Sequence, residues 1–334
     1  MTAIALTWVD SDRVLALKSH ARQSVQQLLV FATLAVLLLV FSFASPYFMT
    51  FSNVSSLLMA TAVTGIQALG LTFVIATGGI DLTPGLGMAL CSVLTGVFLV
   101  TFGLPIWLGV PLGILIGTLI GFVNGLLIAR LRMQPMIATL AMMLVCQGLA
   151  LVFSGASPIY LSKIQGFEAI ARGTLVFGIP NAVTIFFVAA IIAAVLLNKS
   201  ILGRYAISMG SNEAATRISG IDVRKWKILV YMLAGTFTGL SGIVMAARLN
   251  SAQPATGAGY EMYAIAAVVI GGTSLRGGRA NILGTVVGAL IISTINNGLQ
   301  ILSIPDQFQK VVLGVVVLVA VFIDITRRGK ADHD

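Results

Sequence analysis

Long apolar stretches alternate with short polar gaps along the chain from residue 26 onward. A helix needs roughly 20 mostly apolar residues to cross the hydrocarbon core of a bilayer. The pattern therefore predicts about ten transmembrane helices, at residues 26–45, 54–77, 85–102, 106–129, 136–154, 181–198, 226–247, 262–275, 280–301 and 308–325. The eighth stretch is short, so we expect a half-helix there or a re-entrant turn at the glycines that follow.

The positions of the basic residues orient these helices. If the N-terminus is cytoplasmic, only four of the 20 lysines and arginines face the opposite side, namely Lys163, Arg172, Arg248 and Lys310. The other sixteen fall in cytoplasmic loops and tails: Arg13, Lys18, Arg22, Arg130, Arg132, Lys199, Arg204, Arg217, Arg224, Lys225, Lys227, Arg276, Arg279, Arg327, Arg328 and Lys330. Because cytoplasmic loops carry an excess of positive charge, we expect both termini in the cytoplasm and an even number of spans.

These features predict an all-α, polytopic membrane protein with one transmembrane domain at 26–325 between cytoplasmic tails at 1–25 and 326–334. The first apolar run follows a polar lead containing Asp10 and Asp12 and exceeds the usual hydrophobic region of a signal peptide. We therefore expect a retained first helix. Only 9% of the residues are charged and 58% are hydrophobic, against about 25% charged in soluble domains, which excludes a soluble catalytic domain.

The net charge of +9 does not indicate nucleic-acid binding, because the basic residues lie in the short gaps between helices. Both cysteines, Cys91 and Cys146, lie inside apolar runs, where free cysteine behaves as a small hydrophobic residue. His20 and His333 lie near opposite termini. We therefore expect no metal site, no redox site and no cofactor bound by this chain.

Glycine recurs every four residues in the fourth stretch, at Gly109, Gly113, Gly117, Gly121 and Gly125. Small residues at this spacing let membrane helices approach closely. The same four-residue spacing of glycines recurs at Gly235–Gly239 and Gly284–Gly288. A subunit interface and tight packing within the bundle both fit, and we favour the second.

A polar segment at residues 76–85 contains Asp81, the only acidic residue between Asp12 and Glu168. An ionisable group near membrane depth is by default a functional-site hypothesis. Gly78, Gly79 and Pro84 predict a break in the helix, which lipid tolerates only where the backbone lines a cavity or is buried in protein. A compatible alternative is that Asp81 caps the helix starting near Pro84.

A second polar segment, at residues 202–223, lies in the longest predicted cytoplasmic loop. Ser211 or Asn212 can cap a short helix in which Glu213 and Arg217 form an i,i+4 pair, and Gly220 can end it. Such a helix of about two turns is too short to be stable alone in water. We expect it to dock onto another protein; an amphipathic loop resting on the lipid surface is the alternative.

The third segment, residues 271–281, is rich in glycine. Glycine-rich loops can cradle phosphates, but neither this loop nor the rest of the chain contains GxxxxGK[ST]. We expect a tight turn between two packed helices and no nucleotide hydrolysis by this chain. The glycines expected to have structural roles are Gly78, Gly79, Gly271, Gly272, Gly277 and Gly278.

These residues resemble the permease subunits of bacterial ribose/xylose/galactoside-type ABC importers. The resemblance covers about residues 25–328 and rests on GGIDLTPG at 78–85, LGRYAISMGSNEAATRISGI at 202–221, ARLNSAQPATGAGYE at 247–261, AIAAVVIGGTS at 264–274 and NNGLQ at 296–300. Three positions depart from the pattern usual in these permeases: Thr83, Pro84, and Arg276 in the third segment. The identity of the substrate therefore stays open.

The resemblance implies about ten helices per subunit in the bacterial inner membrane and a pore formed with a second permease subunit, expected to be a second copy. It also implies a cytoplasmic ATPase with two nucleotide-binding domains, which uses ATP and Mg, and a periplasmic sugar-binding protein. On this basis residues 203–220 couple the pore to the ATPase. The coupling residues are Gly203, Arg204, Ser211, Asn212, Glu213, Ala214, Ala215, Thr216, Arg217 and Gly220.

Polar residues within the predicted helices or at the predicted break are candidates for the substrate path: Gln67, Thr72, Asp81, Thr83, Asn124, Gln147, Asn296 and Asn297. Each could equally make a satisfied hydrogen bond between helices. On the outer face, Lys163, Arg172 and Arg248 are candidates for docking the binding protein, with plain solvation as the alternative.

We expect a ribose-like pentose or related monosaccharide as cargo. A sugar-derived signal, a polyol or a nucleoside would fit the same architecture. An ion-coupled secondary transporter is the alternative from another class; it predicts carboxylates in several helices and paired broken helices, whereas Asp81 is nearly alone and the sequence shows no clear halves. A membrane-embedded enzyme fits least, because no catalytic constellation is present.

Overall fold

The computed structural model describes the backbone of residues 28–175 and 178–329, and side chains up to residue 322. The structure does not describe the predicted tail 1–25, nor the basic residues Arg13, Lys18, Arg22 and Lys330. The expectation of a retained first helix in place of a signal peptide is therefore not tested over residues 1–27. The predicted tail 326–334 is described only in part, as backbone up to residue 329.

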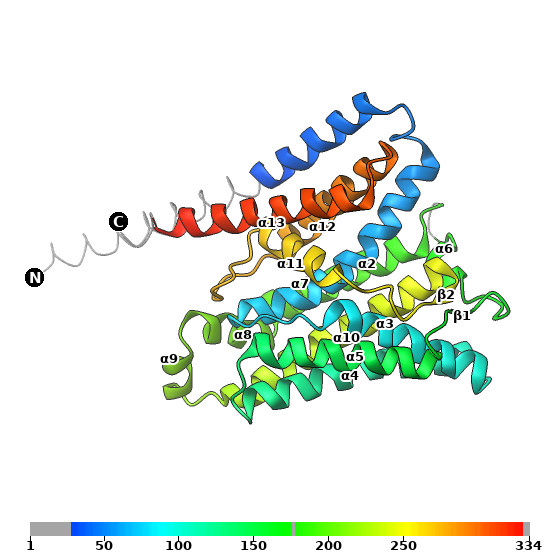
Figure 1. Ribbon diagram of the computed structural model, residues 1–334. Coiled ribbons are helices and arrows are strands. Elements are labelled where there is room, and N and C mark those ends of the chain that lie inside the picture. The colour runs from blue at the N-terminus through cyan, green and yellow to red at the C-terminus, as the bar shows by residue number, and fades with distance from the viewer. Residues whose placement is uncertain (1–27, 176–177, 330–334) are drawn as a thin grey trace, which may run out of the picture.

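The described chain is a bundle of helices (Figure 1). Seven membrane-span candidates are long and apolar enough to cross a bilayer. They are α2 (Phe51–Ala76), α3 (Pro84–Gly96) continued by the π-helical turn η1 (Val97–Thr101), α4 (Ile106–Ala129), α5 (Pro135–Ser154), α7 (Asn181–Lys199), α10 (Val223–Leu249) and α12 (Ile282–Ile301). Further helices are Leu28–Ala44, α6 (Ala169–Arg172), α8 (Ile201–Ser211), α9 (Glu213–Ile218), α11 (Tyr260–Ile270) and α13 (Asp306–Gly329).

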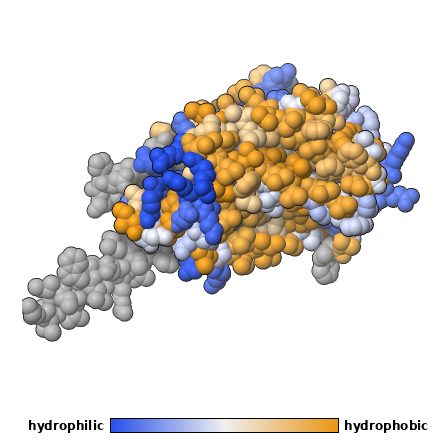
Figure 2. Space-filling view, turned by 90° about the horizontal axis from the view of Figure 1, so that it is seen from below, coloured by the Kyte–Doolittle hydropathy of each residue, from blue (hydrophilic) through white to orange (hydrophobic). Residues whose placement is uncertain are grey.

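Each of the ten predicted stretches therefore contains a helix, although ten membrane crossings and the orientation of the termini stay predictions. The helices α8 and α9 lie at one end of the bundle, together with the last turns of α13, whereas α6 and the two-residue strands β1 (Ile159–Tyr160) and β2 (Ser251–Ala252) lie at the other end (Figure 1). Apolar side chains cover most of the face in Figure 2, and hydrophilic residues gather at the ends. This belt is the surface expected of a protein embedded in a bilayer.

The α4 glycines pack inside the bundle, mainly against α10. A Cβ added to Gly117 would meet the Gly235 carbonyl and lie 2.7 Å from the Gly239 nitrogen. A Cβ at Gly121 would meet the carbonyl of Tyr231. The two backbones therefore touch, which confirms tight packing within the bundle for this series.

The eighth predicted stretch is a half-helix. The helix α11 ends at Ile270, so the prediction that it continues to residue 275 is wrong, and residues 271–281 form the turn expected before α12. A non-helical segment made mostly of turns, residues 253–259, precedes it. Ala252 packs against Gly96 near the end of α3, whereas Gly257 packs against Gly85 at its start. The segment thus runs alongside the membrane-span candidate α3, and the predicted eighth crossing consists of turns followed by a short helix.

A second break separates α2 from α3. The Gln67 side-chain nitrogen donates a hydrogen bond to the Pro84 carbonyl at 3.3 Å, and Gln67 lies nine residues before the end of α2. At 1.5 Å per residue, α3 begins about 13 Å inside the end of α2. Figure 1 shows the two non-helical segments, before α3 and before α11, running through the bundle to helices that start in its interior. The break predicted from Gly78, Gly79 and Pro84 is therefore confirmed.

Candidate functional site

The predicted coupling segment is two helices rather than one. The first, α8, is capped by the Ser200 hydroxyl, which accepts a hydrogen bond from the Gly203 nitrogen at 3.3 Å. The second, α9, is capped by Asn212, whose side-chain oxygen accepts from the Ala215 nitrogen at 2.9 Å. Of the two caps proposed from the sequence, Asn212 is therefore the one observed, and Gly220 follows α9 with a φ of +85°.

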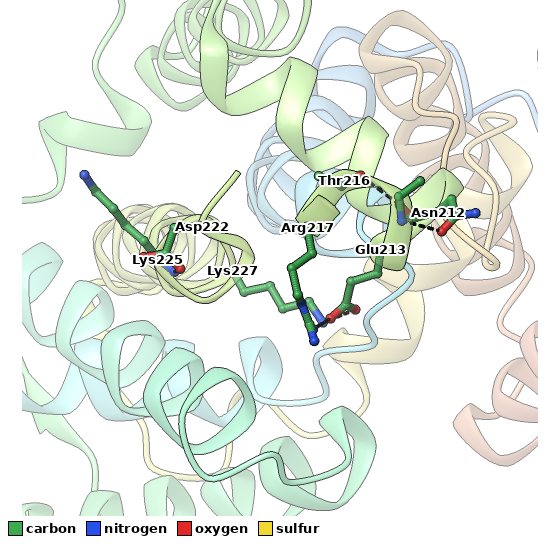
Figure 3. A network of polar contacts seen from close by, with 8 residues as sticks. Asn212, Glu213, Thr216, Arg217, Asp222, Lys225 and Lys227 are labelled. Carbon is green, nitrogen blue, oxygen red and sulfur yellow. Dashed lines mark hydrogen bonds and ion pairs between the residues drawn. The ribbon is translucent and has the colours of Figure 1, made fainter. Parts of the chain in front are cut away.

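Glu213 holds α9 against α10. Its carboxylate pairs with Arg217 of α9 at 3.0 Å and with Lys227 of α10 at 2.7 Å, as Figure 3 shows. The rings of Tyr205 in α8 and Trp226 in α10 meet edge to face, with centroids 4.9 Å apart. A helix too short to persist alone is thereby fixed to one of the longest helices of the bundle.

The ion pairs predict how acid affects this link. Partial burial of Glu213 raises its pKa, but Lys227 and Arg217 outweigh that effect, so its net pKa lies below the ordinary value of 4.5. A carboxylate with a lowered pKa stabilises the fold above its ordinary pKa and loses that contribution as the pH falls through the lowered value. The wild-type protein should therefore unfold at a higher temperature than Glu213→Gln near pH 7, and the difference should vanish in acid well below pH 4.5. Thermal unfolding in detergent measures it; a pH-independent difference would contradict the role of charge.

The outer surface of α9 is open. Ala214, Ala215 and Arg217 are exposed, and Ile218 is 87% exposed. Only Thr216 is buried in this helix. The helix therefore presents small residues, one cation and one large apolar side chain at the polar end of the bundle.

Glycine backbones connect the coupling segment to both breaks. The Gly278 nitrogen donates to the carbonyl of Ala76, the last residue of α2, at 2.9 Å. A Cβ at Gly210 would meet both of these backbone groups, and one at Gly277 would lie 2.6 Å from the Gly78 nitrogen and 2.8 Å from the Gly210 Cα. We call these five residues the glycine junction. Three chain segments meet there with no side chain between them.

The other glycines singled out from the sequence also have geometric roles. Gly79 lies against the Tyr231 hydroxyl, and Gly271 packs on the Gly284 backbone. Gly272 has a φ of +88°, a conformation that favours glycine.

Four of the substrate-path candidates gather at the start of α3. The Thr83 nitrogen donates to Asp81 Oδ1 at 2.9 Å, so Asp81 holds the turn that leads into the helix without capping it directly. Asn124 of α4 donates to the Thr83 hydroxyl at 2.7 Å, and Gln67 of α2 bonds to Pro84. Asp81, Thr83, Asn124 and Gln67 are all buried.

The remaining candidates lie elsewhere. Asn297 of α12 exchanges hydrogen bonds of 2.9 and 2.8 Å with Asn53 of α2. Thr72 pairs with Thr285 of α12 at 2.9 Å. Asn297 and Thr72 therefore fit the alternative interpretation, in which the polar side chain makes a hydrogen bond between helices. Asn296 and Gln147 are half-buried and do not join the group at α3.

The three basic residues at the other end differ in their freedom to dock a partner. Lys163 and Arg172 are exposed. Arg172 Nε donates to the Arg248 carbonyl at 3.0 Å. The side chain of Arg248 is half-buried and hydrogen-bonded to Tyr260. Arg248 thus tethers the start of α11 and is the least available of the three.

Sequence reasoning missed Glu261. It lies in the first turn of α11, and its Oε1 accepts from the Gly259 nitrogen at 3.2 Å. Its Oε2 lies against Gly85 of α3. The only signal in the sequence was that a carboxylate precedes an apolar run. Hydropathy places this carboxylate in a loop.

Comparisons with known proteins agree with this architecture. A family model described as "Branched-chain amino acid transport system / permease component" matches residues 53–321. The chain is 45% identical to a ribose import permease protein of Bacillus subtilis (strain 168), covering 91% of this chain and 94% of the relative.

Two further relatives come from Escherichia coli (strain K12). The L-arabinose transport system permease protein is 38% identical, covering 89% of both chains, and the D-allose transport system permease protein is 36% identical, covering 88% and 90%. No solved structure matches significantly. With seven membrane-span candidates and this similarity over most of its length, the chain belongs to the branched-chain amino acid transport system / permease component family of multi-pass membrane proteins.

Proposed function

We propose that this chain is the transmembrane pore subunit of an ATP-driven ABC importer for a monosaccharide, a ribose-like pentose or a related sugar. The observation that carries the proposal is α9: an exposed two-turn helix held by Glu213 and Lys227 at the polar end of the bundle. Behind it, the glycine junction joins the same segment to α2 and to the α11–α12 turn. A movement imposed on α9 is thereby transmitted to both broken crossings.

The relatives support a sugar as cargo. The family description names branched-chain amino acids, but the curated relatives that cover most of this chain are permeases for ribose, L-arabinose and D-allose. The polar groups at the start of α3 include the amides of Gln67 and Asn124 and the hydroxyl of Thr83. Amides and hydroxyls suit the weak, reversible hydrogen bonds that passage of a sugar requires. A sugar-derived signal, a polyol or a nucleoside would use the same chemistry.

The proposal includes partners. A cytoplasmic ATPase with two nucleotide-binding domains binds ATP and Mg and receives α9, while a second permease subunit, a copy of this chain, completes the pore. A periplasmic sugar-binding protein delivers the cargo near Lys163 and Arg172. The complex resides in the bacterial inner membrane with about ten helices per subunit and both termini cytoplasmic.

The test is uptake by cells or vesicles containing this chain with its cognate ATPase and binding protein, comparing wild type with Glu213→Ala/Arg217→Ala. The double variant removes both ion pairs that fix α9. We expect ATP-dependent uptake to collapse while membrane levels of the chain persist.

Arg224→Ala is a matched control, because Arg224 is an exposed cation in the first turn of α10 and lies outside both ion pairs of Glu213. It should retain most of the uptake. Wild-type uptake that proceeds without an ATPase and follows a proton or sodium gradient would replace the proposal with a secondary transporter.

A further inference from the structure

Three side chains that each carry a buried acceptor oxygen contact three consecutive residues where α3 begins. Asn124 contacts Thr83, Gln67 contacts Pro84 and Glu261 contacts Gly85. In each side chain one oxygen is buried and has no hydrogen-bond partner among the described residues: Asn124 Oδ1, Gln67 Oε1 and Glu261 Oε2. Six buried side-chain oxygens of the described chain lack partners, and half of them lie here.

The surroundings fix which atoms of the two amides are oxygens. The Pro84 carbonyl only accepts hydrogen bonds, so the Gln67 atom 3.3 Å from it is nitrogen. The Thr83 hydroxyl donates to the Thr139 carbonyl at 3.3 Å, so it accepts from Asn124, and the atom 2.7 Å away is again nitrogen. The unpartnered atoms are therefore acceptors, and a ligand that satisfies them must supply hydrogen-bond donors or a cation.

The three side chains lie at membrane depth, and one of them, Glu261, borders the surface of the subunit. The Pro84 contact places them about 13 Å inside the end of α2. Gln67 and Asn124 are 1% and 0% exposed, whereas the Glu261 side chain is only half-buried. A carboxylate at this depth is expensive against acyl chains, and non-helical backbone such as 253–259 is tolerated only in protein or along an aqueous cavity. The face bearing Glu261 therefore faces water or protein.

We propose that Glu261, with Gln67 and Asn124 behind it, forms a transient binding station for the hydroxyl groups of the cargo at the meeting point of the two half-helices. The inference rests on the proposed function and adds a residue and a chemistry to it. Glu261 receives sugar hydroxyls first, and the amide oxygens of Gln67 and Asn124 become available when the first turns of α3 and α11 move apart. Neutral hydroxyl donors are favoured over a metal cation because the relatives are permeases for ribose, L-arabinose and D-allose.

The experiment uses the complete transporter, with ATPase and binding protein, reconstituted in vesicles. ATP-driven uptake of radiolabelled D-ribose and of its 2-, 3- and 5-deoxy analogues is measured for wild type, Glu261→Gln and the control Glu168→Gln, an exposed carboxylate at the outer end. Because the binding protein is unchanged, any shift in the ratio of ribose to an analogue arises in the permease.

We expect Glu261→Gln to lower the maximal rate of ribose uptake about tenfold, as for loss of one hydrogen bond to a charged group. Uptake of at least one deoxy analogue should fall much less, ATP hydrolysis should stay within about twofold of wild type, and Glu168→Gln should match wild type. Unchanged rates and ratios in Glu261→Gln would overturn the proposal. Uptake that requires sodium at constant ionic strength, with the requirement lost in Glu261→Gln, would overturn it in favour of a cation site.

A second variant, Glu261→Cys, avoids dependence on transport activity. The introduced thiol should react with a water-soluble methanethiosulfonate reagent, and D-ribose should slow the reaction; the native Cys91 and Cys146 are buried. If the introduced thiol is not labelled, or if D-ribose does not change the rate of labelling, the proposed binding site is overturned. Failure of the proposed function looks different: wild-type uptake would not depend on ATP, whereas protection of the introduced thiol by ribose would be unaffected.

Discussion

Replacing Gly210 by alanine is expected to abolish sugar uptake while the protein remains inserted in the membrane. The added Cβ meets the Ala76 carbonyl and the Gly278 nitrogen, which bond to each other at 2.9 Å. Both are backbone groups, so neither can rotate away as a side chain would. Overpacking of this kind costs about 1–3 kcal/mol. The end of α8 must therefore separate from α2 and from the Gly277–Gly278 turn.

Uptake and ATP hydrolysis in the assembled transporter measure the effect. We expect uptake to fall by at least roughly tenfold, with hydrolysis continuing, because α9 still docks but its movement no longer reaches the helix breaks. The matched control is Gly148→Ala in α5, where an added Cβ has nothing within 4 Å. If Gly210→Ala transports as well as Gly148→Ala, the glycine junction does not transmit movement.

Replacing Gly117 by leucine should cause the largest loss of folded protein. Its Cβ meets the Gly235 carbonyl and lies 2.7 Å from the Gly239 nitrogen, so α4 and α10 must move apart. Without a hydrophobic force between helices in lipid, close packing is the main source of their association. Separation forfeits the contacts along the whole glycine series and exposes α10 residues that are now buried.

Detergent extraction, size-exclusion chromatography and thermal unfolding follow this change. We expect little monodisperse Gly117→Leu protein and a lower unfolding temperature, whereas Gly148→Leu, in α5, should behave as wild type. Equal behaviour of the two leucine variants would mean that the α4–α10 contact contributes little to assembly. Partial recovery with Gly117→Ala would show that the size of the added side chain decides the outcome.

Local features of the sequence predicted the helices and the coupling segment well. The apolar runs are continuous, so hydropathy located a helix in every predicted stretch. Asn212, Glu213, Arg217 and Gly220 lie within nine residues of one another, and capping rules act over that range. The role of α9 as the docking helix rests on the resemblance and stays a prediction.

The depth of the broken crossings could not be predicted. Hydropathy places residues 253–259 in a loop, and only the contact of Gly257 with Gly85 shows that they run beside a spanning helix. Glu261 was missed for the same reason, because its neighbours in space belong to α3. The pairing of Asn53 with Asn297 likewise joins residues far apart in the sequence, for which a single sequence carries no signal.

The broken eighth crossing has a consequence for how the protein is made. The helix α11 has 11 residues, about 16 Å at 1.5 Å per residue, which is too short for the insertion machinery to retain as an independent span. The turns before it leave backbone groups without helical hydrogen bonds, and lipid cannot satisfy these groups. Its partners α2 and α3 must therefore be in the membrane before it enters, and α12, which packs against α11, follows it in the chain. Insertion of this crossing is thus a late, protein-templated event, and chains truncated before α12 should leave residues 253–270 accessible to protease.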